Sequence, residues 1–160
     1  MAIIKKSQYK EMLWKNGKGR TSEIDRFPHQ ENYLWRLSSA TIAKDGEFSL
    51  FPGFDRWLVV TSGAGVFLND VKLEPLRPFH FSGEEQIHCR LIADEVVDLG
   101  LIFDREKIHA EMIYFSGAIP QTSANPLATY IFDLQSHDTY KDVSDCVVKN
   151  GILITLRNAE

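Results

Sequence analysis

The chain has few of the features that would by themselves define its chemistry. It has two cysteines in 160 residues, Cys89 and Cys146, which are too few for a disulfide framework, although a single bridge stays open. Its 18 basic and 22 acidic residues leave a net charge of −4 and no basic stripe for nucleic acid or an anionic membrane. No apolar run reaches the length of a membrane span, and residues 1–6 lack the apolar core of a signal peptide. These absences predict a reduced cytoplasmic protein with no nucleic-acid or membrane partner.

What the chain does contain is a series of short strand-like runs. Hydrophobic residues make up 44% of the 160 residues, which is enough for one domain with a buried core. Many short strands separated by turn residues are typical of a β-sandwich or β-barrel. The expected strands are 33–42, 48–51, 57–61, 66–68, 71–73, 86–93 and 96–103, and weak helical patterns lie at 7–14 and 104–113.

The stretch 48–56 is the most informative part of the sequence. It places three phenylalanines, a Pro-Gly break and an adjacent acid–base pair directly before the strand-like run 57–61. The glycine-containing turn 62–65 and the run 66–68 follow, and this order predicts a β-hairpin. A hairpin with an aromatic lip and a charged pair at one end predicts a lined cavity.

Several longer motifs resemble a known family. They are 14–24 (WKNGKGRTSEI), 35–38 (WRLS), 45–56 (DGEFSLFPGFDR), 78–83 (PFHFSG) and 88–91 (HCRL). In this combination and spacing they resemble the HutD/Ves family over roughly Trp14 to Arg105. The resemblance implies an all-β fold of the cupin type, an RmlC-like β-barrel or jelly roll, which agrees with the strand pattern. Two positions depart from the family, with Lys18 in place of a glycine and Gly100 in place of an asparagine, and both bear on the pocket or its mouth.

Two domain organisations fit this sequence. The C-terminal third repeats the pattern of strands and turns seen earlier, without repeating its residues. One organisation is a single cupin-like domain over 1–160. The other is a pseudo-duplication, with 1–105 as the main barrel and 106–160 as a degenerate second half.

The cupin resemblance raises the question of a metal. A metal-binding cupin carries a histidine pair and a carboxylate on one strand and a further histidine later, because a metal ion needs several convergent donors. The segment 51–65 contains no histidine, and His88 alone fits the later position. Strand alternation places Cys89 with the apolar neighbours Ile87 and Leu91 and turns His88 outward or to the rim. The sequence therefore predicts no bound metal and no cofactor.

The candidate ligand-binding residues combine two arginines with aromatic side chains. An arginine fork suits a carboxylate, because it makes paired charge-assisted hydrogen bonds. Each candidate also has a plainer interpretation: Arg56 could pair with Asp55 or another acid, Arg36 could be solvated, and the aromatic residues could be core. Asn16 lies in a glycine-rich loop that is either a tight turn or a cover over the barrel mouth, with Thr21 or Glu23 behind it. The candidate set is Trp14, Asn16, Arg36, Phe51, Phe54, Arg56, Phe79, Phe81 and His88.

Three functions remain open. The resemblance implies a non-catalytic protein that binds a small molecule, and the expected ligand is a carboxylate. HutD members are associated with regulation of histidine utilisation, whose intermediates include urocanate and formylglutamate, and Ves members with cold or stress response. The second hypothesis is a metal-independent cupin enzyme of the isomerase or epimerase type, with His80 or His88 opposite Glu23, Asp98 or a tyrosine. The third is a structural or partner-binding module, and a homodimer fits it.

Overall fold

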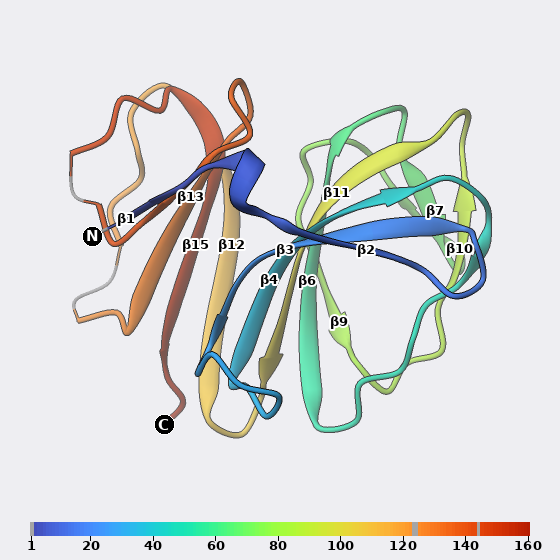
Figure 1. Cartoon of the computed structure of the whole chain (residues 1–160), viewed down its shortest axis with the longest axis horizontal. Coiled ribbons are helices and arrows are strands. Elements are labelled where there is room, and N and C mark those ends of the chain that lie inside the picture. The colour runs from blue at the N-terminus through green and yellow to red at the C-terminus, as the bar shows by residue number, and fades with distance from the viewer. Residues whose placement is uncertain (1, 123–124, 144) are drawn as a thin grey trace. The chain divides into compact units, whose positions relative to one another are not determined.

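The computed structural model describes residues 2–122, 125–143 and 145–160, and these form an almost entirely β structure (Figure 1). The chain divides into two compact units. The larger unit is Lys10–Asp104, and the smaller combines Met1–Tyr9 with Arg105–Glu160. In the described part of the chain, no helix has the length and apolar character needed to cross a membrane.

The larger unit contains two antiparallel sheets. The six-stranded sheet has the order β2-β3-β4-β11-β6-β9, with β2 (Lys10–Leu13), β3 (Gly19–Phe27), β4 (Trp35–Ile42), β11 (Val96–Asp104), β6 (Phe54–Ser62) and β9 (Phe79–Ser82). The four-stranded sheet has the order β5-β10-β7-β8, with β5 (Gly46–Glu47), β10 (His88–Leu91), β7 (Val66–Leu68) and β8 (Val71–Leu73). The predicted all-β class is confirmed.

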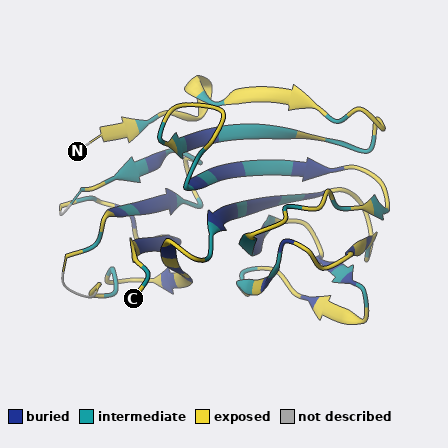
Figure 2. Ribbon diagram, turned by 90° about the horizontal axis from the view of Figure 1, so that it is seen from below, coloured by how far each residue is buried: buried dark blue, intermediate teal, exposed yellow. Residues whose placement is uncertain are grey.

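A shared apolar core joins the two sheets of the larger unit. Ile42, Leu58 and Val60 come from the six-stranded sheet, and Leu68 and Cys89 come from the four-stranded sheet. All five are at most 2% exposed, whereas β2 is exposed along its whole length (Figure 2). Two sheets that pack face to face on one core form a jelly-roll arrangement.

The predicted hairpin between 57–61 and 66–68 is wrong. Both strands form, but β6 pairs with β11 and β9, whereas β7 pairs with β10 and β8. Gly63 and Gly65 have φ angles of +105° and +110°, which lets the chain turn sharply from one sheet into the other. A Cβ on Gly65 would lie 2.5 Å from the Leu73 carbonyl oxygen, so this corner needs glycine for space as well as for its backbone angle.

The smaller unit is built on one antiparallel sheet. Its order is β1-β14-β13-β15-β12, with β1 (Ala2–Ile4), β14 (Thr139–Lys141), β13 (Ala128–Asp133), β15 (Asn150–Asn158) and β12 (Ile108–Ser116). Phe115, Ile131 and Leu153 from this sheet pack with Val148 in a buried cluster. The chain before β2 contributes β1 and a short 3-10 helix, η1 (Lys6–Gln8).

Three local predictions failed because strand pairing depends on distant partners. The helical pattern at 7–14 spans the end of η1 and strand β2, which pairs with β3. The pattern at 104–113 runs into β12, which pairs with β15 along its whole length. Residues 48–51 are not a strand, and the Phe51 N–H donates instead to the Gly83 carbonyl at 2.8 Å. Weak local propensity is overridden where a partner strand lies alongside.

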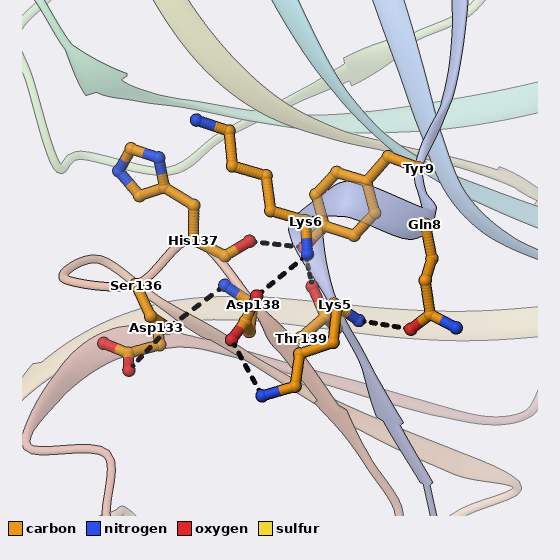
Figure 3. Close-up of polar contacts among 9 residues, drawn as sticks. All are labelled: Lys5, Lys6, Gln8, Tyr9, Asp133, Ser136, His137, Asp138 and Thr139. Carbon is orange, nitrogen blue, oxygen red and sulfur yellow. Dashed lines mark hydrogen bonds and ion pairs between the residues drawn. The ribbon is translucent and has the colours of Figure 1, made fainter.

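Tyr9 fastens the N-terminal segment within the smaller unit (Figure 3). Its hydroxyl donates to the His137 carbonyl at 2.5 Å and lies 2.8 Å from the Thr139 hydroxyl. The Lys6 N–H donates to the Asp138 carboxylate at 2.8 Å. Burial raises the pKa of the Tyr9 hydroxyl to about 12, because the phenolate would lose its hydration.

Tyr9→Phe is expected to lower the free energy of unfolding by about 1 kcal/mol at pH 8, the usual net contribution of a buried hydrogen bond. Because the pKa of Tyr9 is raised from 10.0 to about 12, its contribution is present below pH 10 and is lost as the pH rises toward 12. The stability difference between wild type and variant should therefore shrink over this range in urea unfolding. Tyr140→Phe is the control, since no hydroxyl hydrogen bond is found for Tyr140 in the described residues, and an equal effect in both variants would contradict the role of Tyr9.

Candidate functional site

Strand alternation and register build a polar floor on one face of the six-stranded sheet. Ile102 of β11 lies between Arg36 of β4 and Arg56 of β6. Two residues earlier, Gly100 lies opposite Ser38. Every second residue of a strand points to the same face of the sheet, so the side chains of Arg36, Ser38, Arg56 and Ile102 lie on one face.

This floor forms the base of a cavity of about 590 Å³ within the larger unit. Three further segments line it: the end of β2 with Trp14–Asn16, Thr21 of β3, and residues 47–49 with Phe51. The volume suits a small organic molecule, and the mixture of apolar walls with a few polar groups is typical of ligand pockets. Phe48, Phe51 and Arg56 of the stretch 48–56 line this cavity, although the hairpin from which a lined cavity was predicted does not form.

Two arginines converge inside the cavity. The Arg56 guanidinium lies 5.1 to 5.2 Å from the ring centroids of Phe48, Phe51 and Phe81. The Arg36 guanidinium lies 5.7 Å from the same Phe51 ring. Cations over aromatic faces are favourable, but a ring does not replace a hydrogen-bond acceptor. In the described part of the chain neither guanidinium has a hydrogen bond or an ion pair, and the Nε of Arg36 is buried without a partner.

Asp98 supplies the one buried carboxyl of the cavity lining. It is 5% exposed, and burial raises its pKa to about 7, opposed by the charge of Arg56 and by the Ala40 backbone N–H. Burial also lowers the pKa of Arg56 to about 10, with Asp98 acting against the shift and Arg36 with it. The cavity floor thus holds two guanidinium charges and a carboxyl that is only partly ionised near neutral pH, a balance that favours an anionic ligand.

Local hydrogen bonds shape the cavity wall beside β2. The Trp14 Nε1–H donates to the Thr21 hydroxyl at 2.7 Å, which fixes the indole against β3. The Asn16 carboxamide oxygen accepts from the Lys18 N–H at 2.9 Å, and Gly17 has a φ of +71°. The loop is therefore a tight turn, and its residues Trp14 and Asn16 also line the cavity.

The structure brings together five of the predicted binding residues. Trp14, Asn16, Arg36, Phe51 and Arg56 line the cavity. Their role in binding a ligand stays a prediction.

The other four predicted residues lie outside the lining. Phe81 packs its ring on the Arg56 guanidinium, and Phe79 stacks on Phe81 at a centroid distance of 5.8 Å. Phe54 packs beside Tyr33, with 5.6 Å between the two ring centroids. His88 is on the outer face of β10, with Nδ1 3.2 Å from a Glu47 carboxylate oxygen. The contacts of Phe79 and Phe81 are those of core residues.

Three interpretations from strand alternation are settled by the geometry. The His88 side chain is 49% exposed while Cys89 is 1% exposed, so the predicted faces of this strand are confirmed. Burial also raises the pKa of the Cys89 thiol to about 12, which makes it a poor nucleophile at neutral pH. Asp55 contacts His80, with 3.0 Å between the carboxylate oxygen and Nε2, and does not pair with Arg56.

Sequence reasoning missed Ser38 as part of a site and weighed Asp98 only as an enzymatic acid. Gly100 was connected with the pocket only through its departure from the family pattern, and it lies on the cavity floor. The available signal was the run 96–103, where an aspartate and a glycine two residues apart interrupt one face of an apolar strand. Among residues 2–122, 125–143 and 145–160, no three His, Cys, Asp or Glu side chains gather closely enough to hold a metal ion.

Comparison with known proteins places the chain in a family. The HutD family model matches residues 6–146. A 21.2 kDa uncharacterized protein of Pseudomonas putida, from the region 3′ of hutC, is 36% identical over 125 residues. This match covers 73% of the chain but 65% of that protein, so the chain spans less than two thirds of its relative.

Solved structures agree with this assignment. HutD from Pseudomonas fluorescens SBW25, described in a formate condition, is 30% identical with a TM-score of 0.87, and the match covers 99% of each chain. A conserved protein of unknown function from Pseudomonas aeruginosa PAO1 is 24% identical with a TM-score of 0.84 and coverages of 99% and 98%. An RmlC-like cupin from Ralstonia eutropha JMP134, 5% identical with a TM-score of 0.51 and coverages of 63% and 67%, shows likeness of fold alone. The chain belongs to the HutD family, and its fold is the cupin-like fold that the motifs implied.

Proposed function

We propose that this protein binds a small organic carboxylate in the cavity of its larger unit and acts as a non-catalytic sensor. The observation that carries the proposal is the convergence of Arg36 and Arg56 on opposite sides of Ile102, around one shared Phe51 ring. Two guanidinium groups that form no ion pair in the described residues, with only the partly ionised Asp98 nearby, suit a ligand that supplies further negative charge.

Charge and desolvation explain why the ligand would be an anion. A buried charge without a partner costs several kcal/mol, and a well-placed opposite charge offsets this cost. Asp98 neutralises only part of the charge, since its pKa is about 7. A carboxylate that accepts from both guanidiniums gains charge-assisted hydrogen bonds in a partly dry site, where such bonds are strongest.

The family supports a biological setting for the proposed binding. A relative at 36% identity comes from the region 3′ of hutC, and the resemblance to HutD implies an association with histidine utilisation. Urocanate and formylglutamate, two intermediates of that pathway, are both carboxylates. We propose that the protein senses an intermediate of this class and regulates the pathway accordingly.

Titration calorimetry with urocanate and formylglutamate tests this function, with the corresponding neutral amides as matched controls. At least one acid should bind, and its amide should bind ten-fold or more weakly, because hydrogen bonds to charged groups contribute about 1.5–3 kcal/mol. The acid should also raise the melting temperature. If neither acid binds at millimolar concentration, or if acid and amide bind equally, the proposed function is wrong.

The enzyme hypothesis receives less support from the geometry. It placed His80 or His88 opposite an acid across the pocket, but neither histidine is among the residues that line the cavity. His80 contacts Asp55 and stacks on Trp57, and His88 contacts Glu47. Asp98 alone combines a place in the cavity with a pKa near neutrality, and a single acid–base group serves binding as readily as catalysis.

A further inference from the structure

We propose that the cavity floor contains a second recognition subsite, formed by Asp98, Ser38 and the gap above Gly100, which accepts an N–H or O–H donor of the ligand. This inference rests on the proposed carboxylate site and adds a second requirement to it. The ligand class becomes an acid that carries a hydrogen-bond donor a few atoms from its carboxylate, as N-acyl amino acids and hydroxy acids do.

The register of β4 and β11 brings the three residues together. Asp98 lies directly opposite Ala40, and Gly100 lies directly opposite Ser38. Since both strands alternate, the Asp98 carboxyl and the Ser38 hydroxyl stand on the same face and at diagonal positions around Gly100. All of these residues line the cavity.

Gly100 leaves room between the two polar groups. A Cβ added there would meet the Trp57 carbonyl oxygen at 3.8 Å and the Asp98 carboxylate at 3.9 Å, which are ordinary contacts. A Cβ would therefore fit at position 100 without a steric clash, whereas at Gly65 an added Cβ would clash with the backbone. The consequence of having no side chain is open space on the floor, where a ligand group can reach both the Asp98 and Ser38 side chains.

The hydrogen-bonding capacity of the subsite is incompletely used. The Ser38 hydroxyl is buried and has no partner in the described residues, although buried hydroxyls normally have one. Asp98 accepts from the Ala40 N–H, and a carboxylate has further lone pairs to offer. A ligand donor that reaches these oxygens would satisfy groups whose burial is otherwise costly.

The two subsites have separate chemistry. The arginine pair offers only donors and so selects an acceptor, the carboxylate. Ionised Asp98 offers only acceptors and so selects a donor. A ligand that has both groups would place its carboxylate at Arg36 and Arg56 and its donor at Asp98. This pairing of groups fixes the direction in which the ligand lies on the floor.

Isosteric probes test the donor subsite. N-benzoylglycine carries a carboxylate and an N–H, and O-benzoylglycolate replaces that N–H by an ester oxygen with nearly the same shape. At pH 8.5 wild-type protein should bind N-benzoylglycine about ten-fold more tightly by calorimetry, since one charge-assisted hydrogen bond is lost and an oxygen faces an acceptor. In Asp98→Asn this preference should fall to about three-fold or less, and Ser38→Ala should reduce it in the same direction.

The pH profile separates direct recognition from a structural role. The charged and titratable groups around Asp98 are Arg56 and Arg36 on the neighbouring strands and the Cys89 thiol on β10, with Lys15 and Glu47 also in the lining. Asp98 becomes an acceptor-only carboxylate as the pH rises through about 7. The preference for N-benzoylglycine should therefore be larger at pH 8.5 than at pH 5.5 in wild type, and Asp98→Asn should remove this dependence.

The outcomes distinguish this inference from the function beneath it. If both probes bind wild type equally, or if the preference survives unchanged in Asp98→Asn and Ser38→Ala, the donor subsite is refuted while the carboxylate site stands. If neither probe binds and urocanate and formylglutamate also fail, the carboxylate site itself is refuted and the subsite with it. If Asp98→Asn does not fold, the preference for N-benzoylglycine measured in Ser38→Ala decides whether the subsite exists.

Discussion

Arg56→Met is expected to weaken carboxylate binding by about 30-fold or more without lowering the free energy of unfolding. The lost guanidinium makes charge-assisted hydrogen bonds that contribute about 1.5–3 kcal/mol. The methionine keeps an apolar stem against the rings of Phe48, Phe51 and Phe81. Because Arg56 is desolvated and forms no ion pair in the described residues, its replacement by an apolar side chain removes a desolvation cost, and urea unfolding should show an equal or higher stability. Calorimetry with urocanate or formylglutamate measures the affinity.

Arg90→Met is the matched control for this experiment. Arg90 is an exposed residue of β10 whose guanidinium lies 4.8 Å from the Phe67 ring centroid, and it does not line the cavity. Its replacement should leave carboxylate affinity within about two-fold of wild type. Equal losses in the two variants would show a general effect of positive charge, and an Arg56→Met variant that retains full affinity would remove Arg56 from the site.

Gly65→Ala should destabilise the larger unit by about 3 kcal/mol or more, the largest stability effect that we expect from a single methyl group. Gly65 has a φ of +110°, where a residue with a Cβ is strained, and the added carbon would lie 2.5 Å from the Leu73 carbonyl oxygen. That oxygen belongs to the backbone of β8, so relief of the clash requires the corner between the sheets to move. Chemical denaturation, followed by tryptophan fluorescence, measures the loss.

Gly53→Ala separates the two causes of this destabilisation. Gly53 has a φ of +84° but no atom within 4 Å of the added Cβ, so it carries the backbone strain without the clash. Its replacement should cost about 1 kcal/mol. If the two alanine variants lose the same stability, close packing at the Gly65 corner does not contribute, and the account of this turn is wrong.

Strand patterns were predictable where alternation alone decides the outcome. The sequence alternation at Ile87, His88 and Cys89 predicted which side chains face the core, and the structure confirms it. The existence of β6 and β7 was also predictable, but their pairing was not. The two glycines between them look like a hairpin turn, although they form a corner between sheets because each strand finds its partners elsewhere in the chain.

The candidate site was predictable only in part, for a related reason. Arg36 and Arg56 stand out in the sequence as cations within apolar strands, and both line the cavity. Their approach depends on strand register, because Ile102 of β11 lies opposite Arg36 of β4 on one side and Arg56 of β6 on the other. Asp98 was not identified as their neighbour because its environment arises from the same register, and no local pattern encodes a register between strands so far apart in the chain.

A crystal structure of the protein with urocanate or formylglutamate would show whether the two arginines bind a carboxylate. We expect electron density in the cavity of the larger unit, with the ligand carboxylate accepting hydrogen bonds from both Arg36 and Arg56 at about 2.7–3.2 Å. A ligand bound elsewhere, or one in this cavity with its carboxylate turned away from both guanidiniums, would refute the carboxylate site.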